Sequence, residues 1–99
     1  MFNKQEYQKE YQSRLYQERR YLLDLWQCIV GCQDCGEHFW GRPEVLDCDH
    51  KPGTIKYFNI SHGMNNSFSY LLRELEKCDV VCSNCHRTRT VNRSKIEGI

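Results

Sequence analysis

The chain has 99 residues, with 14 lysines and arginines against 13 acidic residues and a formal net charge of +1. This length corresponds to one small domain, whose core needs an additional staple for stability. The nearly neutral charge gives no global indication of nucleic-acid binding. Seven cysteines, an odd number, and the lack of an apolar run in residues 1–20 argue against a secreted disulfide framework. We therefore expect a cytoplasmic protein with free thiols and neither a signal peptide nor a membrane span.

Residues 3–30 are predicted to form one long helix, so that an N-terminal helical extension (1–30) precedes a domain at 31–95. Apolar residues recur every three or four positions on one face, and no Pro or Gly interrupts the segment before Gly31. That face consists of Tyr7, Tyr11, Leu15, Leu22, Leu25 and Ile29. We expect it to pack against the domain, with a mixed charged face in solvent. A dedicated DNA-binding helix is the alternative.

Two short strands are expected between residues 45 and 60. The segment 45–49 is predicted as the first, with Asp47 and Asp49 on one face and Cys48 on the other. Pro52 and Gly53 predict a turn, and the β-branched and aromatic residues of 54–60 predict the returning strand.

Two further helices are expected in the C-terminal half. Ser67 is the predicted N-cap of a helix that extends through Lys77. Its apolar stripe consists of Phe68, Leu71, Leu72 and Leu75. The last helix is predicted to begin near Ser83 and to carry His86, with a frayed tail after Asn92.

Two CxxC pairs predict a structural zinc site. Cys32 and Cys35 bracket a tight turn before Gly36, and Cys82 and Cys85 repeat this spacing. Tetrahedral zinc closes its shell with four soft ligands, and two such pairs in a reducing protein are a strong signal for it. A redox dithiol is the alternative, but one pair would suffice for it and neither lies in a βαβ pattern. The other cysteines, Cys28, Cys48 and Cys78, are expected to be small buried hydrophobes, with Cys28 as the rival ligand.

Asp49, His50 and His86 are left unused by the zinc pattern, and they suit a second, hard cation and phosphoryl chemistry. Asp49 and His50 are adjacent at a strand end, so one side chain can bind metal while the other faces the substrate. His86 follows Cys85 directly and is held by the zinc knuckle. A carboxylate and an imidazole leave most positions of a divalent ion open for phosphate and water. An imidazole also accepts a proton from water near neutral pH.

A basic segment follows His86. Residues 86–95 contain no acid, and a basic cluster beside a candidate metal site suits a polyanionic substrate. Its residues are Arg87, Arg89, Arg93 and Lys95. We expect them to contact phosphates, with Arg89, one turn after His86, closest to the metal site.

At these residues the chain resembles the HNH endonuclease family, the ββα-metal nucleases, in its form with zinc knuckles. The resemblance runs from CxxCG at 32–36 through Asp49 and His50 to CxxCH at 82–86 and the following Arg-x-Arg-Thr, about two thirds of the chain. It implies a small α+β fold in which zinc staples a ββα-metal core. It also implies that His50 is the general base and that Asp49 and His86 bind the catalytic Mg²⁺, Mn²⁺ or Ni²⁺.

The middle asparagine of the family motif departs from the usual pattern. Many members have it five positions before the second knuckle, where this chain has Lys77. Asn59 is the preferred candidate to orient His50 through a hydrogen bond, although an ordinary turn asparagine is nearly as well supported. Asn84 and Asn92 are further candidates.

The resemblance implies a metal-dependent DNA endonuclease that either nicks or cuts both strands. Its sequence specificity should be low, because phosphate contacts position DNA without reading its bases. Small free-standing members resemble phage or mobile-element nucleases, some of which act beside packaging or recombination proteins in the cytoplasm of a bacterial host. These associations come from the family alone.

Two other functions are open from the residues. A non-catalytic zinc module that binds nucleic acid or a protein explains the cysteines and arginines, but not the coincidence of Asp49, His50 and His86. A redox or zinc-storage protein explains only the thiols.

Overall fold

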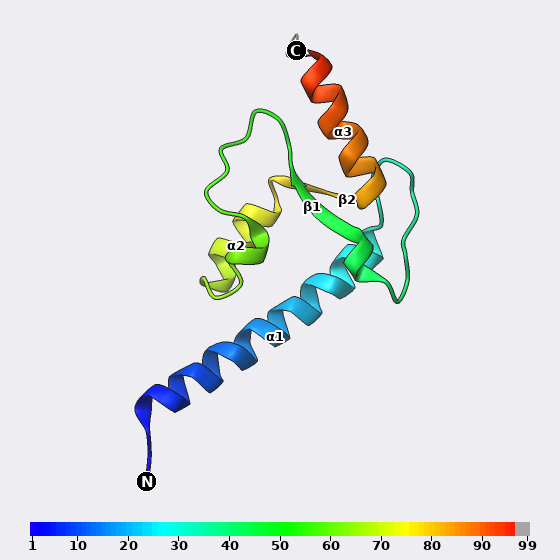
Figure 1. Cartoon of the computed structure of the whole chain (residues 1–99). Helices are drawn as coiled ribbons and strands as arrows, with labels where there is room; N and C mark the ends of the chain where they lie inside the picture. The colour runs from blue at the N-terminus through cyan, green and yellow to red at the C-terminus, as the bar shows by residue number, and fades with distance from the viewer. Residues whose placement is uncertain (97–99) are drawn as a thin grey trace.

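A computed structural model describes residues 1–96, which form three α-helices, two short 3-10 helices and a two-stranded sheet (Figure 1). In chain order these are α1 (Lys4–Val30), η1 (Pro43–Val45), β1 (Leu46–His50), η2 (Ile60–His62), α2 (Phe68–Leu75), β2 (Cys78–Cys82) and α3 (Ser83–Ile96). The predicted small α+β class is confirmed. No helix within these residues has the length and apolar character that a membrane span requires.

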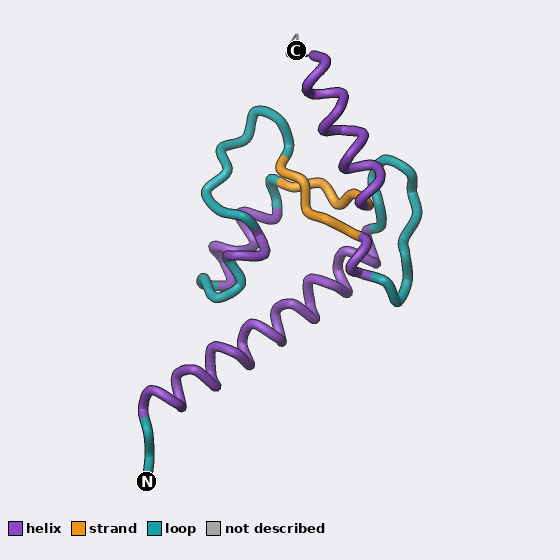
Figure 2. Tube along the Cα trace, viewed as in Figure 1, coloured by secondary structure: helices purple, strands orange, loops and turns teal. Residues whose placement is uncertain are grey.

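The sheet lies at the centre, with α1, α2 and α3 around it (Figure 2). β1 and β2 are antiparallel, with Leu46 opposite Cys82 and His50 opposite Cys78. One residue past the last strand pair, the amide of Lys51 donates to the carbonyl of Lys77 at 2.8 Å. The strand that carries Asp49 and His50 is therefore tied directly to the strand that enters the second CxxC pair.

The prediction of a returning strand at 54–60 is wrong. These residues form a loop that leads into η2, and the partner of β1 is β2. Burial explains the choice, because Val80 and Val81 in β2 are 1% and 0% exposed, whereas Ile55 and Tyr57 in the loop are 69% and 64% exposed. Pairing β1 with β2 removes more apolar surface from water.

α1 begins and ends close to its predicted bounds. The side chain of Asn3 accepts hydrogen bonds from the amides of Gln5 and Glu6, which caps the first turn. Gly31 ends the helix with φ of 75°, and its amide donates to the carbonyl of Gln27. A Cβ at this position would lie 2.8 Å from the ring of His38, so glycine meets both a conformational and a spatial requirement here.

The side of α1 that packs in the core differs from the predicted one. Leu23, Gln27 and Cys28 are buried, whereas residues of the predicted apolar face such as Leu22 and Ile29 are 53% and 62% exposed. The prediction that this face packs against the domain is therefore wrong. The reason is that only the last third of α1 reaches the core, where its orientation is set by the contacts near the first knuckle.

The core consists of two adjoining clusters. One surrounds the CxxC pairs and contains Cys28, Leu46, Val80 and Val81. The other lies between α1 and α2; its buried members are Leu23, Ile60, Met64, Leu71 and Cys78. Trp26 packs against both clusters, so α1 connects the surroundings of the CxxC pairs to α2.

Ser67 caps α2 as predicted, since its hydroxyl accepts a hydrogen bond from the amide of Tyr70. The helix ends at Leu75 rather than at Lys77, because the chain turns there into β2. α3 begins at Ser83, as predicted. It remains helical through Ile96, so the prediction of fraying after Asn92 is wrong for residues 93–96, and the rest of that tail lies outside the described residues.

Candidate metal centre and adjoining groove

The four cysteines of the two CxxC pairs meet at one point. The sulfur atoms of Cys32, Cys35, Cys82 and Cys85 all lie within 4.8 Å of one another. A zinc ion with Zn–S bonds of about 2.3 Å requires sulfurs about 3.8 Å apart, and the Cys35 and Cys82 sulfurs are separated by 4.0 Å. The predicted metal cluster is confirmed as a set of residues that fits a zinc ion.

Backbone amides support the cluster in the manner of metal knuckles. The amide of Cys35 donates to the sulfur of Cys32, and that of Cys85 to the sulfur of Cys82, each at 3.4 Å. Burial raises the pKa of Cys32, but backbone hydrogen bonds outweigh it and lower that pKa to about 6. The hydrogen bond with Cys82, with burial next, raises the pKa of Cys85 to about 12. The neighbouring sulfurs disfavour ionisation of Cys85. All four cysteines can therefore be thiolates at once only if a cation compensates their charge.

The remaining cysteines do not belong to this cluster. The thiol of Cys28, the rival ligand, donates to the carbonyl of Phe39 at 3.6 Å. Burial raises the pKa of Cys48 to about 11 and that of Cys78 to about 12, so both are neutral thiols that pack with the core.

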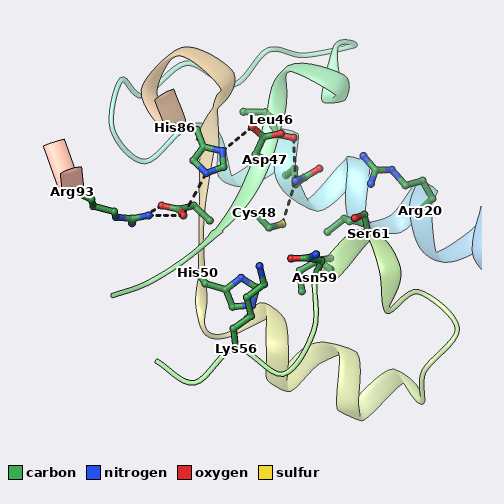
Figure 3. A pocket seen from close by; sticks show the side chains of 14 residues that line it. Arg20, Leu46, Asp47, Cys48, His50, Lys56, Asn59, Ser61, His86 and Arg93 are labelled. Atoms are coloured by element: carbon green, nitrogen blue, oxygen red, sulfur yellow. Dashed lines mark hydrogen bonds and ion pairs between the residues drawn. The ribbon is translucent and has the colours of Figure 1, made fainter. Parts of the chain in front are cut away.

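A groove of about 550 Å³ extends along β1 (Figure 3). Residues from α1, β1, the loop before η2, η2 itself and α3 line it. The four residues predicted for the catalytic site, Asp49, His50, Asn59 and His86, are all among them, as are Arg20, Lys56 and Arg93. The fold thus brings together residues that are up to 37 positions apart in the predicted site, from Asp49 to His86.

Two carboxylates of β1 face the ring of His86. Its Nδ1 atom lies 3.0 Å from Oδ2 of Asp47, and its Nε2 atom lies 3.6 Å from Oδ1 of Asp49. Asp47 and Asp49 share one face of the strand, as the alternation predicted. A carboxylate on one ring nitrogen fixes the tautomer and orients the other nitrogen, which is the usual support of a metal-binding histidine.

Asp49 is also bound by two arginines of α3. Arg93 reaches both of its carboxylate oxygens, at 3.0 and 2.8 Å, and Arg89 reaches Oδ2 at 3.0 Å. The side chain of Asp49 is only 6% exposed. Burial raises its pKa, but the hydrogen bonds from Arg93 and Arg89 outweigh this and hold the pKa below its ordinary value. The two guanidinium groups therefore supply positive charge next to the residue predicted to bind a metal.

Arg89 connects three elements. Besides Asp49 in β1, its guanidinium binds both carboxylate oxygens of Asp34 in the first knuckle, at 2.6 and 2.7 Å, and Asp79 in β2 at 3.0 Å. The hydrogen bond from Arg89 holds the pKa of Asp34 below its ordinary value. Arg89, predicted as the phosphate contact nearest the metal, is held in an ion-pair network. Arg87 and Lys95 on the same helix are exposed.

His50 has a partner that the sequence analysis missed. Its Nε2 atom lies 2.7 Å from Oε2 of Glu74 in α2, a side chain that is 1% exposed. The same carboxylate accepts from Lys77 and from the amide of Tyr57. Burial raises the pKa of Glu74, but these hydrogen bonds outweigh it and hold the pKa below its ordinary value. His50 is thus anchored to a buried, ionised acid.

Asn59 lies in the groove near His50 and Lys56, at the residue before η2 (Figure 3). No hydrogen bond joins the Asn59 and His50 side chains in the described part of the chain, so the orienting role predicted for Asn59 stays a prediction. The side chain that contacts His50 in the structure is Glu74. A signal for Glu74 was present in the sequence, since it is an acid on the buried face of α2, next to Leu75 and three residues after Leu71.

Comparisons with protein-family profiles, with curated proteins and with solved structures find no match to the chain.

Proposed function

We propose that the protein is a metal-dependent DNA endonuclease. The observation that carries this proposal is that Asp49, His86 and His50 line one groove, in which Oδ1 of Asp49 lies 3.6 Å from Nε2 of His86 and His50 contacts the buried acid Glu74. Two antiparallel strands followed by a helix that contacts both, stapled by a four-cysteine cluster, also support the resemblance to ββα-metal nucleases.

Asp49 and His86 fit a divalent cation. Two ligand atoms 3.6 Å apart can share one ion at the bond lengths of about 2.0–2.2 Å that such metals use with oxygen and nitrogen. When bound there, the ion would supply Lewis-acid stabilisation to a phosphate oxygen and the leaving group. Asp47 holds the ring of His86 in the required orientation. The carboxylate of Asp49 must exchange its bond to Arg93 for the ion.

His50 is the proposed general base. Because Nε2 donates to Glu74, the lone pair lies on Nδ1, which is the atom that accepts a proton from the attacking water. The buried carboxylate stabilises the imidazolium that results, as the acid does in other carboxylate–histidine pairs. In this proposal the general base and the cation ligands are different residues.

Basic residues around the groove are suited to the DNA backbone. Arg20 and Lys56 lie on its α1 and loop sides and Arg93 lies on its α3 side, whereas Arg87 and Lys95 are exposed on other sides of α3. Contacts of this kind position the strand and contribute a salt-dependent, sequence-independent affinity.

The test is plasmid cleavage by the zinc-loaded protein with Mg²⁺, Mn²⁺ or Ni²⁺, and with a chelator as the control. His50→Ala should abolish cleavage while zinc content and DNA affinity stay unchanged, because a general base acts in the transition state. Asp49→Ala and His86→Ala should be partly rescued by high Mn²⁺ or Ni²⁺, whereas His50→Ala should not. If wild-type protein leaves supercoiled, linear and single-stranded DNA intact with every ion, the proposal fails.

A non-catalytic zinc module that binds nucleic acid is the second candidate, and one observation favours it. Both carboxylate oxygens of Asp49 are bonded to arginine side chains. On this account the arginines never release Asp49, and DNA binding is independent of divalent ions. Binding with unchanged affinity in a chelator, together with the absence of cleavage, would select this candidate.

A further inference from the structure

One side of α1 carries an apolar stripe that no other part of residues 1–96 covers. The side chains of Tyr7, Tyr11, Leu22, Leu25 and Ile29 are between 44% and 62% exposed. The core uses a different side of the helix, around Leu23 and Gln27. Contiguous exposed apolar surface of this kind on a small protein marks an interaction site.

The spacing of the stripe is that of a helix pair. Tyr11, Leu15, Leu22, Leu25 and Ile29 fall on the a and d positions of a seven-residue repeat, in which Glu18 occupies the remaining inner position between them. Such a repeat keeps one seam facing a partner helix along the whole length. The partner of this surface is therefore expected to be a helix of similar length.

The N-terminal half of α1 is an otherwise unsupported helix. It projects away from the sheet and the other helices (Figure 1), and every residue from 1 to 18 except Leu15 is exposed. Isolated helical segments of this length are only marginally stable in water, and packing of an apolar face is what usually stabilises them. A helix laid along the stripe would supply that packing.

The stripe continues into a second apolar surface. A groove of about 410 Å³ lies between α1 and α2, and Leu22 belongs to both the stripe and the groove. Phe68 and Leu72 of α2 line the groove and are 51% and 43% exposed. At its rim Arg19 donates to the carbonyls of Met64 and Asn66, which fixes the loop before α2 against α1.

We propose that the occupant is a second copy of the chain, whose α1 lies antiparallel along this one. With the two helices fully overlapped, Leu22 faces Tyr11 of the second copy. Tyr11 of each copy thereby lies over the Leu22 edge of the groove between α1 and α2 of the other copy. Each chain thus supplies both surfaces, as a twofold interface requires.

The charges select the antiparallel direction. In this register Glu18, the acid within the stripe, lies next to Arg14 of the second copy, and the twofold axis repeats the pair. A parallel pair would instead place Arg14 against Arg19 of the copy, at positions that face each other across such a seam. α1 is about 40 Å long and about 10 Å wide, so the strip buries about 400 Å² per chain. With the surface of α2 the total approaches the roughly 1,000 Å² of a specific interface.

The oligomeric state of the zinc-loaded full chain tests this proposal, measured by sedimentation or light scattering across the micromolar range. Wild type should be a dimer, and Tyr11→Glu should dissociate at least about tenfold more readily, since it buries a charge. Tyr16→Glu is the matched control, because Tyr16 is 41% exposed on another side of the same helix. A monomeric wild type, or equal effects of both variants, would overturn the proposal.

A mixing experiment tests the register. Arg14→Glu and Glu18→Arg should each weaken the dimer, because each places like charges together. An equimolar mixture of the two should restore it, since every cross-chain pair in the mixed dimer is again of opposite charge. Neither chain changes its own sequence on mixing, so a change in helix propensity cannot produce the rescue. A dimer that ignores both single substitutions would overturn the antiparallel register.

Discussion

The Nε2 atom of His50 lies 2.7 Å from Oε2 of Glu74, which joins the end of β1 to a buried carboxylate in α2. This contact connects the predicted base to a helix that lies between the two strands in the chain. Its consequence is chemical, because an ionised acceptor at Nε2 leaves Nδ1 as the atom that accepts a proton. Lys77 and the amide of Tyr57 keep the carboxylate in place and ionised.

Glu74→Gln should therefore change the tautomer of His50, the proposed base, and leave the proposed metal ligands Asp49 and His86 unchanged. The amide group of glutamine favours the opposite tautomer of His50, and we expect cleavage to fall by about 10²–10⁴-fold, as when the acid of a comparable triad becomes an amide. The imidazole nitrogen shifts of His50 measured by NMR give a readout besides activity. Glu76→Gln, at an exposed position of the same region, is the control. Unchanged nitrogen shifts together with full activity would contradict the assignment.

The four-cysteine cluster makes a prediction about folding. Purified protein should contain about one zinc per chain, and Cys82→Ser should lose much of its structure, because binding energy in such a site is folding energy. Cys48→Ala should keep the metal and incur only a packing penalty, since Cys48 lies outside the cluster. Elemental analysis and circular dichroism with and without a chelator measure both effects. Full zinc and full stability in Cys82→Ser would refute the assignment.

Local signals in the sequence were sufficient for the starts of the helices and for the end of α1. α1 ends at Gly31, α2 is capped by Ser67 and α3 begins at Ser83, each where a capping residue or a change of pattern predicted it. The strand partner of β1 was not predictable in the same way. Residues 54–60 have strand composition, but pairing depends on which segment buries its side chains against α1 and the cysteine cluster, and that is a long-range property.

The same distinction applies to the site. Asp49, His50 and His86 were predicted to lie together from residue type and spacing, and one groove contains them all. Asp47 and Glu74 were missed as their partners because each acts through a contact across 39 or 24 positions of the chain. The exposed face of α1 was mistaken for a packing face for a related reason. Periodicity identifies an apolar face, but not whether this chain or another covers it.

Arg89 should matter more for stability than for DNA binding. Arg89→Gln leaves Asp34, Asp49 and Asp79 without a shared cation, and we expect a loss of about 2 kcal/mol, less than for a fully buried pair because Asp34 and Asp79 are partly exposed. Urea unfolding at neutral pH measures it. Arg87→Gln, at an exposed position of α3, is the control and should change stability little.

The acid dependence of this network has a definite sign. The pKa values of Asp34 and Asp49 are lowered in the folded protein, so the stability they contribute is present above their ordinary range. It is lost as the pH falls below about 4. The stability difference between wild type and Arg89→Gln should therefore shrink on acidification. A difference that stays constant from neutral to acid pH would contradict the network.

Arg93 tests whether Asp49 exchanges a guanidinium for a metal ion. Its two nitrogens bind both oxygens of the carboxylate, and Oδ1, the oxygen that faces His86, has no other arginine partner within residues 1–96, so Arg93→Gln should free Oδ1 and raise the affinity for Mn²⁺ by about tenfold, which calorimetry or the Mn²⁺ resonance signal measures. DNA affinity should move the other way, with a salt dependence lower by about one unit of slope, because one phosphate contact is lost. Asp49→Asn should abolish Mn²⁺ binding and so locate the site. Unchanged Mn²⁺ affinity in Arg93→Gln would mean that the ion does not use Asp49, and the non-catalytic candidate would then be favoured.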